Sequence, residues 1–389
     1  MKIAFFSNCY LPYLSGITIS IKTLRESLEA LGHEVFVVGP EYPNFKETDR
    51  HVLRLPSIPA PYPGYRFVFP FSAKVFKQLK EEKIDIIHAH QPFGIGLSAL
   101  YLSRKLQIPL VYTFHTLFPR YVHNVPFVPS VISKAITVRY LRFFCNQVNA
   151  VIAPSTMVKR YLKILGVKKP IEVVPTGVNV GKIQDTRDKA QILSKHQIPN
   201  NSKILLFSGR ISEEKNILFL IKAFPSILEK APGTYLVLCG GGPKEAEYRK
   251  FAKQFTDRII FAGQIPHTEL TAYYQAADLF VYSSISETQG LVLCEAKANG
   301  LPIVALFGGG LTDVVESGID GYLVPRNPAI FVEHVVRLLN DDQLRAKMAT
   351  RAKEDALARF SPKTVANKMI SVYQNLAGIQ ICISKDSAL

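Results

Sequence analysis

The chain has 389 residues, of which 48% are hydrophobic and 20% charged, and its net charge is +16. This length exceeds one ordinary core and suits two domains, and the apolar content argues against a disordered chain. Its five cysteines show no Cys-x-x-Cys spacing, which argues against a disulfide framework and a zinc site. The sequence contains no run of eighteen apolar residues, so we expect no membrane-spanning helix.

Short apolar runs rich in β-branched residues alternate with amphipathic stretches along the chain. We expect one set of strands at Lys2–Ser7, Glu34–Gly39, Ile84–Ala89, Leu110–Phe114, Ala150–Ala153 and Glu172–Val174. We expect a second set at Lys203–Phe207, Thr234–Cys239, Arg258–Ala262, Leu279–Ser283, Ile303–Leu306 and Gly321–Val324. The helices between them include Ile17–Leu31, Gly94–Leu106, Leu218–Ala231 and Asp341–Phe360. This alternation predicts two α/β domains, each with a parallel sheet covered on both faces.

The polar segment Gly181–Ser202 lacks a strand pattern, so we expect it to link the two domains. The predicted domains are residues 1–185 and 195–360, and a last helix, Phe360–Ala377, begins after Ser361 with Pro362 in its first turn. Ligands of such folds bind outside the carboxyl ends of the strands, so two facing Rossmann-like domains predict a cleft between them.

Two segments of the second half carry groups that suit a sugar nucleotide. Gly209, Arg210 and Lys215 follow the strand Lys203–Phe207 and supply two cations beside a flexible glycine. Such cations stabilise the negative charge of a leaving diphosphate. For an isolated Gly-Arg-x4-Lys, a solvated surface turn is the ordinary interpretation.

The second segment, Ser286–Ala305, holds Glu287 and Glu295 with seven residues between them, and a glycine loop follows at 308–310. Carboxylates accept hydrogen bonds from vicinal hydroxyls, and free N–H groups after the glycines suit an anion. The alternatives are a dipole-favoured carboxylate at Glu287, a surface position for Glu295 and a simple tight turn at the glycines.

Together, Phe207–Asn216 and Ser286–Ala305 resemble the donor site of retaining glycosyltransferases of family 4, which have the GT-B fold. The resemblance implies that Arg210 and Lys215 clamp the diphosphate and that Glu287 lies beside the donor sugar. It also implies that Glu295 binds the ribose. The other donor-binding groups that it implies are Gly16, Gly209, Gly290, Leu291, Gly309 and Gly310. The final helix, within 361–389, is expected to cross back onto the first domain.

His115 ends the strand Leu110–Phe114 and matches the family's catalytic-site histidine. A lone histidine at a strand end is more often structural, and we interpret His88 and His90 as structural or as lining of an acceptor cleft. No Asp-x-Asp occurs, so we expect no metal and no other cofactor. The resemblance implies same-face attack, in which the departing phosphate takes the acceptor proton.

The basic residues concentrate in the first half. Residues 1–180 carry 22 Lys and Arg against 10 Asp and Glu, whereas the remainder carries 25 against 21. This asymmetry predicts a polyanionic partner for one domain. The expected contacts with an anionic membrane are Arg66, Lys74, Lys77, Lys80, Lys134, Arg139 and Arg142. The alternative is that these helices only cover a sheet and carry lysines on their wet face.

Three further segments (10–20, 113–123 and the Ser-Glu-Thr-Gln-Gly form of the donor motif) resemble bacterial diacylglycerol glucosyltransferases of family 4. This resemblance implies UDP-glucose as donor, a membrane lipid such as diacylglycerol as acceptor, and a cytoplasmic protein bound peripherally to the inner face of the plasma membrane. Three alternatives stay open: a soluble sugar phosphate or small alcohol as acceptor, a GT-B epimerase, and a non-enzymatic polyanion-binding protein. No nucleic-acid-binding module is recognisable.

Overall fold

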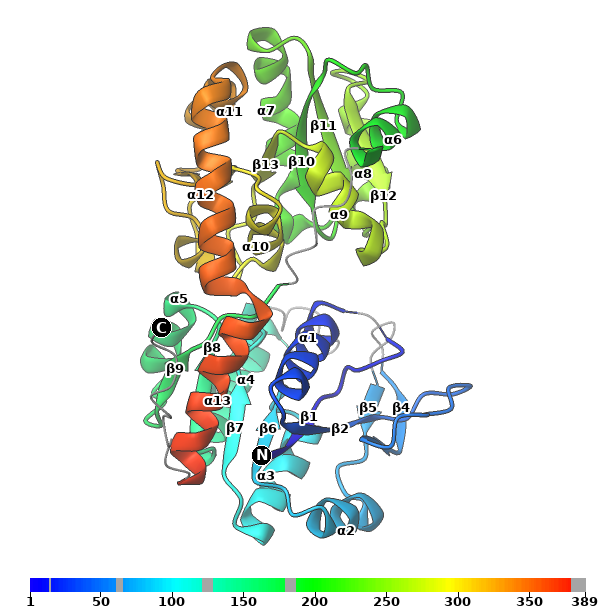
Figure 1. Ribbon diagram of the computed structural model, residues 1–389, viewed down its shortest axis with the longest axis vertical. Coiled ribbons are helices and arrows are strands. Elements are labelled where there is room, and N and C mark those ends of the chain that lie inside the picture. The colour runs from blue at the N-terminus through cyan, green and yellow to red at the C-terminus, as the bar shows by residue number, and fades with distance from the viewer. Residues whose placement is uncertain (14, 61–65, 121–128, 179–186, 379–389) are drawn as a thin grey trace, which may run out of the picture. The chain divides into compact units, whose positions relative to one another are not determined.

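The structure is a computed structural model that describes residues 1–13, 15–60, 66–120, 129–178 and 187–378. The chain divides into two compact units, the first formed by Met1–Gly177 with Pro362–Leu389 and the second by Val178–Ser361. Each unit is a parallel sheet with helices on both faces (Figure 1). The α/β fold class expected from the sequence is therefore confirmed for both units.

The sheet of the first unit has the strand order β3-β2-β1-β6-β7-β8-β9, with every neighbouring pair parallel. Its strands are β1 (Lys2–Phe6), β2 (Glu34–Pro40), β3 (Val52–Leu55), β6 (Ile86–Ala89), β7 (Leu110–Thr113), β8 (Ala150–Ala153) and β9 (Ile171–Val173). The short strands β4 (Ser57–Pro59) and β5 (Arg66–Val68) form a separate antiparallel pair.

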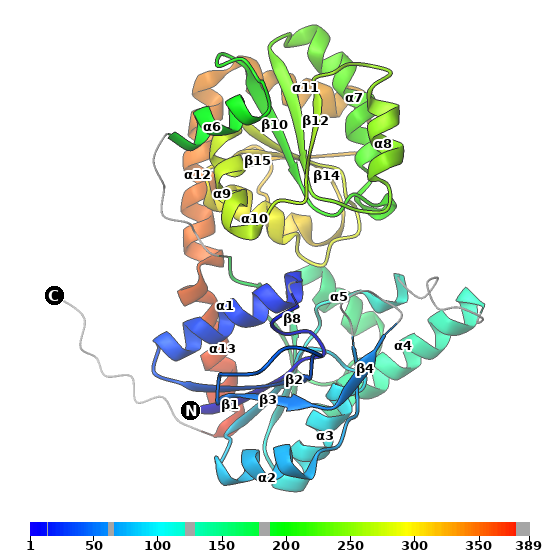
Figure 2. The ribbon, with the colours of Figure 1, turned by 90° about the vertical axis from the view of Figure 1, so that its right-hand side faces the viewer.

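Alternate residues of β1 point to opposite faces of this sheet, and both faces are apolar. Ile3 and Phe5 pack against α1 (Gly16–Ala30) and α13 (Pro362–Ala377). Ala4 and Phe6 face the other core, beneath α2 (Ala73–Glu81), α3 (Ile95–Leu106), α4 (Ser130–Gln147) and α5 (Thr156–Ile164). Figure 2 shows α1 and α13 on one side of the strands and α2 and α3 on the other. Burial on both faces explains why the strands read as unbroken apolar runs.

The second unit has the strand order β12-β11-β10-β13-β14-β15, again all parallel. The strands are β10 (Lys203–Ser208), β11 (Thr234–Cys239), β12 (Ile259–Gly263), β13 (Leu279–Tyr282), β14 (Ile303–Leu306) and β15 (Gly321–Val324). The helices are α6 (Arg187–Lys195), α7 (Ile217–Lys230), α8 (Glu245–Ala252), α9 (His267–Ala276), α10 (Leu291–Ala298), α11 (Pro328–Asn340) and α12 (Asp342–Phe360). β10 and β13 are neighbours, and the chain winds outward from them in both directions, which makes their junction the switch point of the sheet.

Three features differ from the expectations. The edge strand β3 and the pair β4–β5 were not expected, because each is short and proline lies beside or within them at Pro56 and Pro59. The segment expected to be a linker contains the helix α6, which packs against α9. The loop at 308–310 opens a five-residue 3-10 turn, η4 (Gly309–Asp313), which is too short to provide the N-terminus of an α-helix for an anion.

Candidate active site

Three loops of the second unit leave the carboxyl ends of neighbouring strands. Residues 209–216 follow β10, residues 283–290 follow β13, and residues 307–313 follow β14. Parallel strands bring these loops to one edge of the sheet, at the switch point where ligands of such sheets bind. The residues expected to bind the donor therefore converge, although they lie far apart in the sequence.

Lys215 ends a 3-10 turn, η3 (Glu213–Lys215), and its backbone is fixed across the switch point. Asn216 adopts a left-handed conformation with φ 54° and begins α7. Its Nδ2 donates to the carbonyl of Ser283 at 3.3 Å, and the Ser283 hydroxyl donates to the carbonyl of Lys215 at 2.9 Å. These reciprocal bonds place the Lys215 side chain beside the loop that carries Glu287.

Lys215, Tyr282 and Glu287 form a closed polar triangle. The Lys215 Nζ donates to Glu287 Oε1 at 2.5 Å and to the Tyr282 hydroxyl at 3.2 Å, and that hydroxyl donates to Glu287 Oε1 at 2.8 Å. The Lys215 and Glu287 side chains are only 20% and 16% exposed. Charges that are removed from water in this way interact strongly with each other.

The triangle shifts the pKa of each member. Burial lowers the pKa of Lys215, but Tyr282 and Glu287 outweigh burial and the net pKa is raised. Burial raises the pKa of Glu287, but the charge and hydrogen bond of Lys215 outweigh it and the net pKa is lowered. Burial, with the charge of Glu287, raises the pKa of Tyr282. At neutral pH the site therefore holds an ammonium, a carboxylate and a neutral phenol.

Glycines let the third loop approach Glu287. Gly309 has φ 59°, and a Cβ there would lie 2.6 Å from the backbone oxygen of Glu287. The Gly310 N–H donates to that same oxygen at 2.8 Å. These glycines therefore hold the loop of Glu287, and the Gly310 N–H is already used inside the protein.

Glu295 lies one turn into α10 and contacts a different tyrosine. The Tyr274 hydroxyl donates to Glu295 Oε2 at 2.9 Å. Burial, followed by the charge of Glu295, raises the pKa of Tyr274 well above its usual value, so the phenol remains a donor. Gly290, with φ 86°, precedes the helix, and the first N–H groups of α10 have no acceptor within the helix.

Arg210 and Gly209 lie at the same edge. The Arg210 side chain is exposed, and within the described part of the chain its guanidinium forms no ion pair or hydrogen bond. Gly209 has φ 149°, and its N–H donates to Cys239 at 2.9 Å. The structure thus provides one cation that is buried and paired, Lys215, and one that is exposed.

In the first unit, Gly16 is the first residue of α1, behind Ser15, whose hydroxyl accepts from the Thr18 N–H at 3.1 Å. A Cβ at Gly16 would meet nothing within 4 Å, so packing does not require glycine there. An open backbone at a helix N-terminus suits the close approach of an anion.

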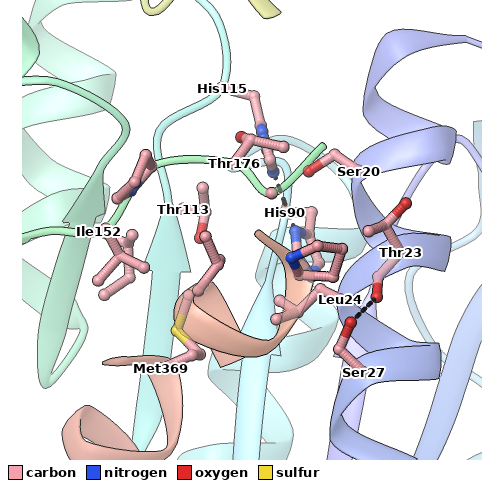
Figure 3. Close-up of a pocket in the computed structure, with 15 residues that line it drawn as sticks. Ser20, Thr23, Leu24, Ser27, His90, Thr113, His115, Ile152, Thr176 and Met369 are labelled. Atoms are coloured by element: carbon pink, nitrogen blue, oxygen red, sulfur yellow. Dashed lines mark hydrogen bonds between the residues drawn. The ribbon is translucent and has the colours of Figure 1, made fainter. Parts of the chain in front are cut away.

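His115 follows β7, is partly buried, and lies beside two buried histidines, His88 and His90. We call these three residues the histidine column. The His88 and His90 rings stack with centroids 4.3 Å apart, and His90 and His115 with centroids 5.3 Å apart. His90 Nδ1 lies 3.0 Å from His115 Nε2. His90 and His115 also line a cavity of about 20 Å³ together with hydroxyl groups of α1 (Figure 3).

Burial depresses the pKa of every histidine in the column. The pKa is lowered to about 3 for His88 and to about 4 for His115, and that of His90 falls well below its usual value. All three rings are therefore neutral at neutral pH. A neutral imidazole donates through one nitrogen and accepts through the other.

The expected membrane contacts are mostly exposed. On α2, Lys74, Lys77 and Lys80 face outward while Val75 and Leu79 are buried. The guanidinium of Arg66 is used within the β4–β5 pair, where it donates to the Ser57 hydroxyl at 2.7 Å.

On α4, Ile132, Ile136, Arg139 and Phe143 recur at helical spacing and are all exposed, with Ile136 61% and Phe143 51% exposed. Lys134 and Arg142 flank this stripe. We call this surface the α4 stripe. Leu141 and Phe144 on the opposite side are fully buried, so basic and apolar residues share the outer surface only.

Some functional contacts were not visible in the sequence. Tyr282 and Tyr274 were not proposed. Tyr282 ends β13, from which the loop of Glu287 leaves, and that position was the available signal; Tyr274 lies on α9 and had no such signal. Lys297 of α10 is fully buried, where it pairs with Asp320 at 2.6 Å and with Asp355, and the sequence analysis did not anticipate either pair. Tyr62, Tyr65 and the segment 121–123 lie outside the described residues.

No helix within the described residues is both long and apolar enough to span a bilayer. The same residues contain no group of three or more His, Cys, Asp or Glu side chains arranged to hold a metal ion.

Comparison with known proteins identifies relatives over the whole chain. Residues 14–182 match the family model described as Glycosyltransferase Family 4, and residues 188–355 match that described as Glycosyl transferases group 1. The alpha-monoglucosyldiacylglycerol synthase of Streptococcus pneumoniae is 34% identical over 332 residues, which cover 83% of this chain and 75% of that protein. The enzyme of the same name from Acholeplasma laidlawii is 30% identical and covers 97% of both chains.

Solved structures share the fold at lower identity. The Anabaena protein HepE in complex with UDP and glucose has a TM-score of 0.76 at 22% identity and covers 97% of this chain. WaaG, described as a glycosyltransferase involved in lipopolysaccharide biosynthesis, has a TM-score of 0.68 at 17% identity. These similarities support the two-domain GT-B architecture expected from the sequence.

Proposed function

This chain belongs to glycosyltransferase family 4, and we propose that it transfers a hexose from a nucleoside diphosphate sugar to a membrane lipid, with retention of anomeric configuration and without a metal ion. The best-supported version of the proposal has UDP-glucose as donor and diacylglycerol as acceptor, since two relatives of at least 30% identity are named alpha-monoglucosyldiacylglycerol synthases. The observation that carries the transfer itself is the Lys215–Tyr282–Glu287 triangle at the switch point of the second unit.

The triangle leaves one N–H group of Lys215 available to bind a nucleotide sugar. An ammonium has three N–H groups, and Tyr282 and Glu287 accept two of them. In the proposal the third N–H, together with the exposed guanidinium of Arg210, binds the diphosphate and stabilises its charge as the glycosidic bond breaks. Because these cations are fixed before the reaction, little reorganisation is needed when the charge develops.

The two glutamates have separate roles in the proposal. Glu287, held by Lys215 and by the backbone of Gly309 and Gly310, orients hydroxyls of the sugar. Glu295, supported by Tyr274, accepts from the ribose hydroxyls. The N–H groups of Gly290 and Leu291 at the start of α10 add donors for phosphate oxygens. Gly16 and His115 belong to the first unit and are proposed as further substrate-binding residues.

A lipid acceptor fits the α4 stripe. The stripe consists of three exposed apolar side chains and Arg139, which lie on the outer surface of an amphipathic helix in the more basic half of the chain. Such a helix suits the interface plane of an anionic bilayer, where each nearby Lys or Arg contributes about 1 kcal/mol. We therefore place the protein on the inner face of the plasma membrane, with α2 and α4 against the lipid.

The direct test is to incubate purified protein with radiolabelled nucleotide sugars and a lipid extract containing diacylglycerol, and then to count label in the organic phase. The proposal expects label from UDP-glucose, a product that keeps the donor's anomeric configuration, and the same rate in saturating chelator. Label only in an aqueous product, formed with a soluble sugar phosphate or small alcohol, would replace the lipid proposal with the soluble-acceptor alternative. Turnover of nucleotide sugar without any acceptor would indicate an epimerase.

Membrane contact has its own test. Ile136→Glu with Phe143→Glu should weaken sedimentation with anionic vesicles, whereas Leu357→Glu, a similarly exposed apolar position on α12, should leave it unchanged. Binding should also fall as salt rises, because salt screens the attraction to the bilayer surface. Equal binding of all three proteins, or equal binding to neutral vesicles, would refute the assignment of the α4 stripe.

A further inference from the structure

Lys297 joins α10 to three other segments of the second unit, and the proposed transfer makes no use of it. Its side chain is fully buried, and an ammonium has three N–H groups. They donate to the Val314 carbonyl at 2.6 Å, to Asp320 Oδ2 at 2.6 Å, and to Asp355 Oδ2. Every N–H of Lys297 is therefore used inside the protein, which excludes direct binding of a ligand.

The three acceptors lie on separate segments. Val314 directly follows η4, and its N–H donates to the Leu311 carbonyl at 3.0 Å, which makes it part of that turn. Asp320 lies in the loop before β15, and Asp355 lies on α12, which packs against α10 (Figure 1). Lys297 thus ties α10 to the turn η4, to the loop before β15 and to α12.

A second cation, on α12, holds the same turn. One guanidinium nitrogen of Arg359 donates to the carbonyl of Asp313, the last residue of η4, and another donates to both Asp355 oxygens at 3.2 Å. Asp355 therefore bridges Lys297 and Arg359, and the two cations hold consecutive carbonyls at the end of the turn. We call Lys297, Asp355 and Arg359 the η4 clasp.

The clasp holds two elements that carry the proposed donor residues. Glu295 lies shortly before Lys297 on α10. Within η4, the Gly310 N–H donates to the Glu287 carbonyl at 2.8 Å. A shift of this turn would therefore move the backbone of Glu287, while α10 carries Glu295.

Stability alone does not account for these buried charges. Burial, although opposed by Lys297, leaves the pKa of Asp320 raised above its usual value, so the carboxylate is less favoured there than in water. Replacing a buried ion pair by apolar residues of similar volume is often neutral or stabilising. What the ion pairs add is direction, because each N–H needs its acceptor at one place.

We propose that Lys297 is a positioning residue that fixes the turn η4 against α10, and so sets the place of the Glu287 backbone relative to Glu295. The proposal rests on the proposed function for the identity of the bound ligand, a nucleoside diphosphate sugar. The positioning of the turn is a property of the second unit by itself.

The test variant removes the clasp without leaving a buried charge unpaired. Lys297→Met alone leaves Asp320, whose side chain is 2% exposed, without its cation, and should be strongly destabilised. Lys297→Met with Asp320→Asn removes both charges, whereas Asp355 is 25% exposed and keeps Arg359. This double variant should unfold in urea close to the wild-type midpoint. Lys203→Met is the matched control, because Lys203 also pairs with α12 but at the opposite end of β10 from the donor loops.

Hydrogen exchange at the Gly310 amide measures the hold on the turn without any ligand. In the double variant this amide should exchange about tenfold faster or more, while the amides of β10, which report global unfolding, exchange as in wild type. Wild-type exchange at Gly310 would overturn the proposal. If the double variant does not fold, Arg359→Met decides in its place, because that side chain is 42% exposed and holds the same turn, and wild-type exchange there would overturn the proposal equally.

Kinetics connect the turn to the reaction. Glu295 is also held by the Tyr274 hydroxyl, so the affinity of the double variant for UDP in calorimetry should stay close to that of wild type. A displaced Glu287 loses its alignment, so kcat should fall by about tenfold to a hundredfold in the double variant and not in Lys203→Met. Unchanged kcat together with fast Gly310 exchange would refute the link to the donor site. If wild type shows no turnover with any nucleotide sugar, the proposed function fails, and the exchange result still decides how the turn is held.

Discussion

Replacing Lys215 by methionine tests the buried triangle quantitatively. Methionine keeps much of the volume of the side chain and removes its charge, so Glu287 becomes a buried carboxylate supported by Tyr282 alone. Breaking a buried pair by removing one partner costs about 3–5 kcal/mol in unfolding free energy. Because the two side chains are only 20% and 16% exposed, solvent screening reduces this cost little.

The cost depends on pH with a definite sign. In the wild-type protein the folded pKa of Glu287 is lowered, so its contribution to stability is present above the unfolded pKa and is lost as pH falls. In Lys215→Met, burial is no longer opposed by the ammonium, so the folded pKa of Glu287 rises above the unfolded value. Protonation of Glu287 then relieves the unpaired charge, and the difference from wild type should shrink between pH 7.5 and pH 5.

Urea unfolding of four proteins measures both effects: wild type, Lys215→Met, Glu287→Gln and the double variant. The double variant should be less destabilised than the sum of the single variants, because the buried charge that Lys215→Met leaves behind is absent from it. A loss below about 1 kcal/mol for Lys215→Met at pH 7.5, or additive single effects, would refute the triangle as described. It also follows that an activity loss in Lys215→Ala or Glu287→Ala counts as functional only after folding has been verified.

Three further outcomes are expected. The folded pKa of each ring in the histidine column lies well below the unfolded value of about 6.5, so acidification from pH 7 to 5.5 should cost about 1.2 kcal/mol of unfolding free energy per histidine. A His90→Asn protein with the same pH dependence as wild type would contradict this. Tyr274→Phe should weaken UDP binding in calorimetry by about tenfold, because a hydrogen bond to a charged group contributes roughly 1.5–3 kcal/mol. Unchanged affinity would contradict the proposed binding of the ribose by Glu295. Lys297→Ala should destabilise the second unit by about 3–5 kcal/mol in urea unfolding, because it leaves Asp320 buried without its cation. A change near zero would show that the ion pairs of Lys297 with Asp320 and Asp355 do not stabilise the fold.

The sequence predicted the strands that place the donor residues, because strands buried on both faces read as apolar runs. It also predicted that Lys215 and Glu287 lie at one edge, since both follow parallel strands. Their direct contact was not predictable, because Lys215 and Glu287 are 72 residues apart and meet only where β10 and β13 are neighbours. The buried ion pair of Lys297 was missed for a similar reason: helical spacing gave no indication of Asp320 or Asp355.

His90 illustrates a second limit of the sequence. His88 lies on β6 and His90 directly follows this strand, and the sequence analysis interprets both as structural or as lining of an acceptor cleft. The contacts of His88 with Thr113 and Tyr373 agree with a structural role. Only the structure shows that His90 Nδ1 contacts His115 and that His90 Nε2 has no hydrogen-bond partner among the residues that it describes. The sequence offers no feature that assigns different roles to these two histidines, whereas their hydrogen bonds in the structure differ.

The most direct test of the central claim is the rate of sugar transfer from UDP-glucose to diacylglycerol in mixed vesicles, measured with wild type and with a folded Glu287→Gln protein. We expect label in the lipid phase for wild type and a loss on the order of a hundredfold or more for the variant, because Glu287 bonds to Lys215 and the proposed function has these two residues orient the sugar and stabilise the diphosphate. Wild-type transfer by a folded Glu287→Gln protein would contradict the assignment of the donor site to the Lys215–Tyr282–Glu287 triangle.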